Sequence, residues 1–188
     1  MQSNVNFNRK FLLSCFIILI SFCLILIFPG ILKEISLYLS RHVPVIKNQL
    51  SRGTEIGNSA ANYFSIIITL IPFLIIYVAA GENFYLRIKE TAKRRHKNLG
   101  LSLLFLYLSG VPVCLFVLYA MYSASLSTSK PPYLFGEHIA FFMANSYAGL
   151  FIFGGLAGMG ALIFSVIFIA LIIAPFQALQ QPPKNAKK

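Results

Sequence analysis

The chain has 188 residues, of which 57% are hydrophobic and only 11% are charged, and its formal net charge is +11. Soluble domains have about 25% charged residues, so this composition excludes a soluble domain and indicates an integral membrane protein. The excess positive charge is divided among short segments between apolar runs, which is typical of topology signals, and no nucleic acid is expected as a partner.

Four apolar runs are each long enough to cross a hydrocarbon layer of about 30 Å, which requires about 20 helical residues. We expect the four spans at residues 11–32, 60–80, 99–122 and 147–174. The first run is too long for the apolar part of a signal peptide, which has about 7–15 residues, so an uncleaved helix is expected. The predicted fold is therefore a single all-α transmembrane domain, residues 1–188, with four helices.

The segment between the first two spans, residues 33–59, has apolar residues at helical spacing. We expect an amphipathic helix that lies on the outer face of the membrane and bends near Pro44. Counted from the end of the first span, the apolar positions are Ile31, Leu32, Ile35, Leu39, Val43, Ile46 and Leu50.

Two spans contain an internal proline, Pro72 in the second and Pro112 in the third. Proline lacks a backbone donor and clashes with the carbonyl four residues earlier, so each helix is expected to kink. A packing kink, in which a neighbouring helix or a hydroxyl such as that of Thr69 or Ser109 compensates for the lost bond, is favoured over a functional gate.

The fourth apolar region, residues 139–174, is too long for one span. Residues 139–146 are therefore expected on or above the outer surface, with the span itself tilted. Pro175 marks the place where this helix is expected to bend or stop.

Basic residues determine the predicted orientation. The loop at residues 81–98 carries six of them, whereas the loop at residues 123–146 carries only Lys130. By the positive-inside rule, loop 81–98 and both termini are expected in the cytoplasm, and loops 33–59 and 123–146 outside. The same basic cluster is expected to attract anionic lipids, at about 1 kcal/mol per charge. It consists of Arg87, Lys89, Lys93, Arg94, Arg95 and Lys97.

The sequence shows no pattern typical of a catalytic, cofactor-binding or metal-binding site. No charged residue lies within the four spans, the three histidines lie in separate loops, and the three cysteines lie in apolar runs. Charged groups deep in a membrane are costly and mark function when they occur. We therefore expect a protein that is not an enzyme and that needs no cofactor or metal.

The pair Glu137 and His138 is the most chemically suggestive feature outside the spans. A carboxylate before a helix is stabilised by the helix dipole, and this interpretation is favoured over contact with a partner. Asn62, Asn145 and Ser146 are interpreted as polar anchors near outer helix ends.

Four small residues in the fourth span, Gly154, Ala157, Gly158 and Ala161, recur at spacings of three and four. Such spacings let helix backbones approach closely, so these residues are predicted to form a packing interface. The neighbour is another helix of the same chain, a second copy or a different protein, and the first of these is favoured.

With this layout, the chain resembles the immunity proteins of pore-forming colicins of the A and B type. The resemblance rests on residues 65–77 (SIIITLIPFLIIY), which lead into residues 87–89 (RIK), and on residues 174–179 (APFQAL) at the exit of the last helix. It implies a protein of the bacterial inner membrane that meets the hydrophobic hairpin of a membrane-inserted toxin and prevents its channel from opening.

The expected function is therefore binding to another membrane protein, with immunity to a pore-forming bacteriocin as the leading version. The alternative is a structural or accessory subunit of an inner-membrane assembly for conjugation, secretion or the exclusion of incoming plasmids. A small carrier or channel is less favoured, because the sequence has no charged residue at depth and no inverted repeat.

Overall fold

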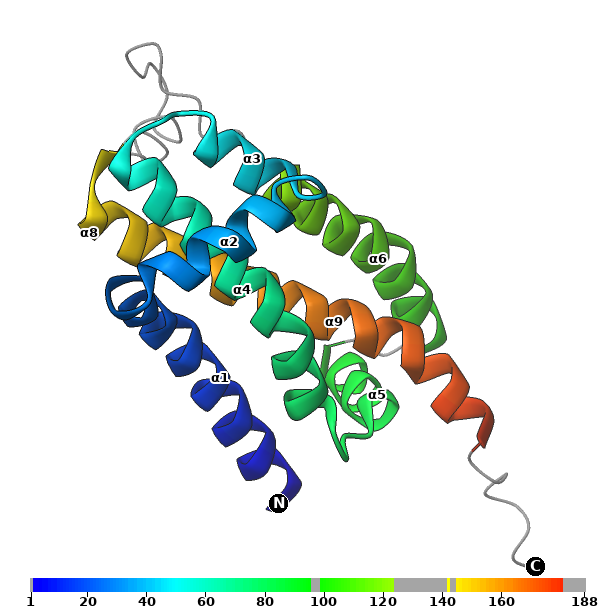
Figure 1. The fold of residues 1–188 in the computed structure, drawn as a ribbon. Helices are drawn as coiled ribbons and strands as arrows, with labels where there is room; N and C mark the ends of the chain where they lie inside the picture. Colours follow the sequence, from blue (N-terminus) through cyan, green and yellow to red (C-terminus); the bar gives the residue numbers. More distant parts are fainter. Residues whose placement is uncertain (1, 96–98, 124–141, 143–144, 181–188) are drawn as a thin grey trace, which may run out of the picture.

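The structure is a computed structural model that describes residues 2–95, 99–123, 142 and 145–180. Every regular element in these residues is a helix, which confirms the predicted all-α class. Four helical segments are long and apolar enough to cross a membrane, as the hydropathy predicts: Asn6–Ile27, Glu55–Ala79, Gly100–Tyr122 and Tyr147–Gln180. In chain order (Figure 1) the elements are α1 (Gln2–Ile27), α2 (Pro29–Leu39), α3 (Pro44–Leu50), α4 (Glu55–Ala79), α5 (Phe84–Arg95), α6 (Leu99–Ser123), α8 (Tyr147–Gly149), the π-helix η1 (Leu150–Gly154) and α9 (Gly155–Gln180).

The first helix ends earlier than the predicted span over residues 11–32. α1 stops at Ile27, and α2 begins at Pro29. Phe28 separates them with a non-helical backbone, φ −127° and ψ 55°. Proline suits the first position of a helix, where no backbone donor is needed, but it disrupts a helix interior. Pro29 therefore ends one helix by beginning the next.

Capping residues explain two other helix starts. α4 begins at Glu55, five residues before the predicted span, because the Thr54 side chain accepts the N–H of Gly57 at 3.0 Å. The last span begins at Tyr147, where Ser146 accepts the N–H of Gly149 at 2.9 Å.

The last helix also continues beyond its predicted end at residue 174. α9 passes through Pro175 and ends at Gln180. Of the two expectations at Pro175, a stop is wrong, and a bend stays a prediction. Membrane helices tolerate an internal proline where local adjustments or neighbouring groups satisfy the freed backbone carbonyl.

The segment after α1 forms two helices instead of one bent amphipathic helix. α2 and α3 are separated by a turn, and Pro44 stands at the first position of α3. On the predicted apolar face, Leu32, Val43 and Ile46 are buried, whereas Ile31 is exposed. Both helices pack on α4, so this segment caps one end of the bundle and does not lie free on the membrane face.

α4 is the central helix of the bundle (Figure 1) and contacts α1, α2, α3 and α9. In its most apolar stretch 44% of the residues are buried, compared with 22% for α1, 6% for α6 and 22% for the last span. The core at its centre joins Ile18 of α1, Tyr63 and Ile67 of α4, and Leu162 of α9.

Different segments of the chain form the two ends of the bundle. The Lys10 ammonium of α1 donates to the Ala80 carbonyl just after α4 at 3.1 Å, and the Tyr85 N–H of α5 donates to Gln177 Oε1 of α9 at 3.1 Å. The start of α1, helix α5 and the end of α9 thus share one end, the α5 end, and α2, α3 and α8 lie at the other, the α3 end (Figure 1). This arrangement agrees with the alternation of sides that the hydropathy predicts.

Candidate functional site

The described part of the chain contains no group of three or more His, Cys, Asp or Glu residues that could hold a metal ion. Cys15, Cys23 and Cys114 are free thiols. Glu137 and His138, the pair that the sequence analysis singles out, lie outside the described residues. The features that remain are packing surfaces, polar clusters and cavities.

The glycines of the fourth span face other helices of the same chain. A Cβ added at Gly154 would lie 2.8 Å from Tyr63 Cε1, and one added at Gly158 would lie 2.9 Å from both Ile18 Cγ2 and Ile67 Cδ1. At these two positions α9 and η1 thus approach α1 and α4 more closely than any side chain allows.

Not every predicted small residue belongs to this close approach. Gly154 and Gly158 are buried, whereas Ala157 and Ala161 are only partly buried. Gly155 joins the buried face instead, because a Cβ there would lie 2.8 Å from Leu19 Cδ2. The inward face therefore runs along Gly154, Gly155 and Gly158, with the two alanines on its flank.

Tyr63 packs against this glycine face, and the sequence analysis does not identify it as a packing residue. It is fully buried, and its hydroxyl donates to the Ile18 carbonyl at 3.3 Å. Its ring meets Phe22 edge to face, with ring centres 5.7 Å apart, and covers Gly154. The only signal in the sequence is a tyrosine in the middle of an apolar run.

Both internal prolines lie inside continuous helices, Pro72 in α4 and Pro112 in α6. The neighbouring hydroxyls do not compensate the carbonyls that these prolines free. Thr69 donates to the carbonyls of Ser65 and Ile66, at 2.7 and 2.9 Å, and not to that of Ile68. Ser109 likewise donates to Phe105 at 2.7 Å. Thr69 and Ser109 therefore do not supply the compensation, and its supply by a neighbouring helix stays a prediction.

The basic cluster of loop 81–98 divides into bound and exposed members. Arg87 forms an ion pair with Glu82 at 2.8 Å, and its guanidinium lies 4.0 Å from the centre of the Phe7 ring of α1. Lys89 lies 5.6 Å from the centre of the Tyr85 ring. Arg87 thus fastens α5 to α1. Two members, Lys93 and Arg94, are exposed at the end of α5; Arg95 is its last residue, and Lys97 lies outside the described residues.

Gln177 joins α9 to the turn before α5. Its Oε1 accepts the N–H of Tyr85 at 3.1 Å, and its Nε2 donates to the Glu82 carbonyl at 3.4 Å. This glutamine lies in the segment 174–179 that carries the resemblance stated above. Sequence reasoning does not find this role, because the residues that it joins are more than ninety positions apart.

A buried polar cluster joins α2 to α4 near the α3 end. The Ser36 hydroxyl donates to Asn62 Oδ1 at 2.7 Å, and the Ser65 hydroxyl donates to Ser36 Oγ at 3.0 Å. All three side chains are buried. Asn62, which the sequence analysis interprets as a polar anchor near an outer helix end, is therefore part of a buried link between two helices.

A cavity of about 310 Å³ lies next to this cluster. It is lined in part by Asn62, by Asn58 and Glu55 at the start of α4, by Lys33 of α2 and by Tyr147 of α8. Because it carries both signs of charge, it has no evident selectivity for an anion or a cation.

α3 contains a second buried polar side chain. Gln49 is fully buried, and neither its Nε2 nor its Oε1 has a hydrogen-bond partner within the part of the chain that the structure describes. An unsatisfied buried amide costs about 1–3 kcal/mol. Burial also lowers the pKa of the Arg52 guanidinium, which follows α3, below its ordinary value. Near the α3 end, burial of the polar side chains of Gln49 and Arg52 therefore costs folding free energy.

α6 is the span with the most exposed surface. Only 6% of its most apolar stretch is buried, and Phe105 and Phe116 are each 72% exposed. It is attached along one side to α9, where Gly110 faces Leu171, and the Tyr122 hydroxyl donates to the His42 carbonyl beside α3. The strongly exposed large side chains recur at helical spacing: Leu101, Phe105, Leu108, Phe116 and Tyr119.

Comparison with known proteins gives no match: no protein-family model matches the sequence, and no match was found among curated proteins or solved structures.

Proposed function

We propose that this protein acts by binding another membrane protein through the exposed face of α6, and that this partner is a pore-forming bacteriocin against which it gives immunity. The observation that carries the proposal is the exposed apolar stripe on α6, a span attached to the bundle along one side only. The inference that the partner is a pore-forming bacteriocin rests on the resemblance to colicin immunity proteins.

The stripe on α6 suits recognition between helices. A partner helix in a membrane gains mainly from close van der Waals packing, since lipid tails are as apolar as the side chains themselves. Large aromatic side chains dominate the energy of many protein interfaces. On α6 two phenylalanines, Phe105 and Phe116, project on either side of Pro112. The glycine face of α9 does not serve the same purpose, because helices of the same chain occupy it.

The proposed orientation places the α5 end in the cytoplasm. The described residues at that end include seven basic ones: Arg9, Lys10, Arg87, Lys89, Lys93, Arg94 and Arg95. Those at the α3 end include four: Lys33, Arg41, Lys47 and Arg52. An excess of basic residues marks the cytoplasmic side, so both termini are cytoplasmic and α2, α3 and α8 face outward in the bacterial inner membrane.

The experiment compares two matched phenylalanines in cells that express the protein and meet a series of pore-forming toxins. Phe116 on α6 is 72% exposed, and Phe73 on α4 is 71% exposed. Replacing either by alanine removes a similar exposed ring. If α6 carries recognition, Phe116→Ala should weaken protection by about tenfold in toxin concentration, as expected for loss of an interface aromatic worth about 1.4 kcal/mol. Phe73→Ala should protect like the unmodified protein.

The measurement is the membrane potential of the challenged cells. Cells that express the unmodified protein should stay polarised with one toxin class and depolarise with others. Depolarisation under every toxin tested, together with loss of plasmid transfer or secretion when the gene is deleted, would replace immunity by the assembly-subunit function. Equal loss of protection in Phe116→Ala and Phe73→Ala would remove α6 as the recognition surface.

A further inference from the structure

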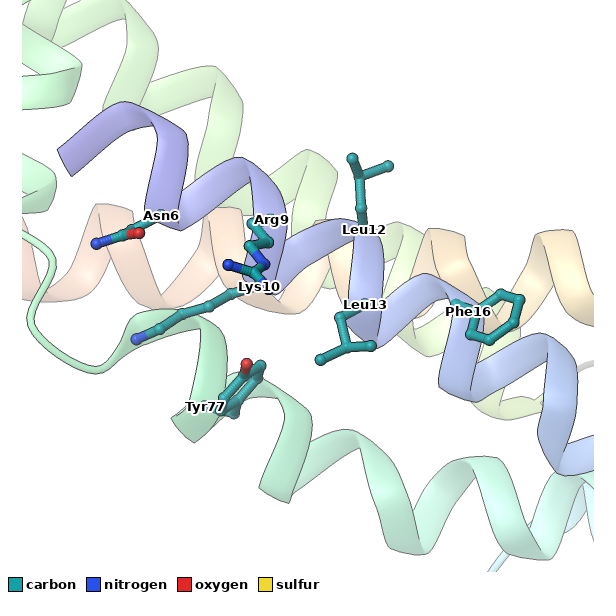
Figure 2. Close-up of a pocket in the computed structure, with 7 residues that line it drawn as sticks. All are labelled: Asn6, Arg9, Lys10, Leu12, Leu13, Phe16 and Tyr77. Atoms are coloured by element: carbon teal, nitrogen blue, oxygen red, sulfur yellow. The ribbon is translucent and has the colours of Figure 1, made fainter. Parts of the chain in front are cut away.

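The α5 end contains a second cavity that the proposed function does not use. It has a volume of about 710 Å³ and lies between the first half of α1 and the last turns of α4 (Figure 2). Its lining residues come from α1, except for Tyr77 of α4. The polar ones are Asn6, Arg9, Lys10 and Tyr77, and the apolar ones are Leu12, Leu13 and Phe16.

The polar part of this groove has a net positive charge. None of its lining residues is acidic, and Arg9 has no ion-pair partner among the residues that the structure describes. The acidic residue that follows α4, Glu82, is paired with Arg87. Two positive charges, those of Arg9 and Lys10, therefore stand at the groove, and none of its described lining residues is a carboxylate that could neutralise them.

Lys10 is held in place by the end of α4. Its ammonium donates to the Ala80 carbonyl at 3.1 Å and lies 5.4 Å from the centre of the Tyr77 ring. An ammonium has three donors, and this contact uses one of them. Figure 2 shows Lys10 and Leu13 of α1 directed toward α4, with the Tyr77 ring facing them. The Lys10 ammonium is thus fixed at the rim of the groove, and two of its three N–H donors are available for a ligand.

The rest of the groove is apolar and open. Leu12 and Phe16 are 67% and 58% exposed, and Leu13 is 46% exposed. These residues continue along α1 from the charged rim into the span. A ligand that fits has an anionic group at one end and a hydrocarbon chain directly behind it.

We propose that this groove binds one anionic phospholipid. Its phosphate lies between Arg9 and Lys10, because a guanidinium and an ammonium are the two side-chain groups that proteins use most for phosphate. One acyl chain follows Leu13 and Phe16 along α1. A zwitterionic lipid binds less well, because its own ammonium adds a third positive charge beside the first two. This site lies apart from the exposed face of α6 and does not depend on the proposed immunity function.

The test measures lipid retained by the full-length protein in detergent, by native mass spectrometry, after addition of phosphatidylglycerol or phosphatidylethanolamine. Arg9→Gln/Lys10→Gln removes the two charges of the groove. Its matched control, Arg41→Gln/Lys47→Gln, removes two exposed charges at the α3 end, outside both the groove and the basic cluster of loop 81–98. At about 1 kcal/mol per charge, the first variant should bind phosphatidylglycerol about thirtyfold more weakly, and the control should bind it like the unmodified protein. Equal weakening in both variants would overturn the site, because it would show only general attraction to positive charge.

A second variant tests the apolar wall with both charges kept. Leu13→Trp fills the groove and should reduce retained phosphatidylglycerol while the helix content stays unchanged. Full retention of this lipid in Leu13→Trp would overturn the proposal, even if the double variant at Arg9 and Lys10 failed to fold.

Two competitors identify the source of the anionic group. Inorganic phosphate at millimolar concentration should not displace the lipid, because it has no chain for the apolar wall, and displacement by it would overturn the proposal in favour of a simple anion site. An acidic amphipathic peptide should also fail to compete. If that peptide displaced the bound lipid at a lower concentration than free phosphatidylglycerol does, the groove would be assigned to a protein segment and the lipid proposal overturned.

Discussion

Gly158→Ala should destabilise the protein although alanine is the better helix former. The added Cβ would lie 2.9 Å from Ile18 Cγ2 and from Ile67 Cδ1. Ordinary contacts between carbon atoms measure about 3.5–4.0 Å, so two contacts are too short by about 0.6–1.1 Å. Ile18 and Ile67 are 0% and 3% exposed, and β-branched side chains in helices have one strongly preferred rotamer. Ile18 Cγ2 is attached to the β-carbon, so it moves aside only if this rotamer or α1 itself changes, whereas Ile67 Cδ1 can turn about χ2.

The magnitude follows from two opposing effects. Overpacking a core costs about 1–3 kcal/mol, and glycine to alanine in a helix interior contributes about 0.8–1.0 kcal/mol of stability. Because the added Cβ meets two buried side chains from two helices, and Ile18 Cγ2 is fixed by its rotamer, the overpacking cost should fall in the upper part of its range. The expected net loss is about 1–2 kcal/mol, which corresponds to a melting temperature lower by about 2–8 °C for a chain of this size.

Gly160→Ala is the matched control. Its Cβ would lie 2.8 Å from Met121 Cε, so the contact is at least as short. That atom is the end of a flexible side chain, which turns away at little cost. Gly160→Ala should therefore be neutral or more stable by up to about 1 kcal/mol. Thermal unfolding in detergent, followed by circular dichroism, measures both variants. If Gly158→Ala melted at or above the temperature of Gly160→Ala, close packing of α9 on α1 and α4 would not be a source of stability.

Three further predictions concern capping, the buried polar cluster and orientation. Thr54→Ala should cost about 1 kcal/mol of stability, because it removes the side-chain acceptor at the start of α4; an unchanged melting temperature would contradict that cap. In a double-mutant cycle, Ser36→Ala and Asn62→Ala should show a coupling energy of about 0.6–1.7 kcal/mol, the range for hydrogen bonds between membrane helices, and additive losses would mean that their hydrogen bond contributes nothing. In intact cells, a membrane-impermeant thiol reagent should label Lys47→Cys and not Lys93→Cys, both in a background without native cysteines; the reverse pattern would invert the proposed orientation.

The four spans are predictable from sequence because charge is costly in a hydrocarbon layer. Each predicted run lacks charged residues over about 20 positions, and any helix crossing a membrane needs such a run. The ends of the spans depend instead on local chemistry. Pro29 begins a new helix, and Thr54 caps α4 six residues before the predicted span begins at residue 60. A hydropathy average does not register either effect, although both residues are visible in the sequence.

The contacts that join helices are less predictable. The sequence analysis favours packing of the small residues against another helix of the same chain, and the structure places Gly154 and Gly158 in that way. It does not identify Tyr63 as their neighbour. Ser36 lies in the polar segment between the first two spans, yet it is fully buried. Its hydrogen-bond partner Asn62 lies 26 residues away, so the sequence near Ser36 does not indicate this burial. Such pairs form because α2 packs on α4, and a local sequence pattern does not predict that packing.

The inward position of the glycine face separates two roles that the sequence alone does not distinguish: holding the spans together and contacting a partner. Gly154 and Gly158 face core side chains of α1 and α4, so exchanging α9 for that of a colicin immunity protein, as a test of the proposed function, changes the core. Loss of protection after that exchange reports on folding as much as on recognition. The exposed stripe of α6 has few core contacts, so an exchange limited to it changes surface chemistry alone. A change of toxin specificity with the α6 stripe, at unchanged melting temperature, would therefore be attributable to recognition. A change that follows only α9, with the fold intact, would mean that the toxin reaches between the spans.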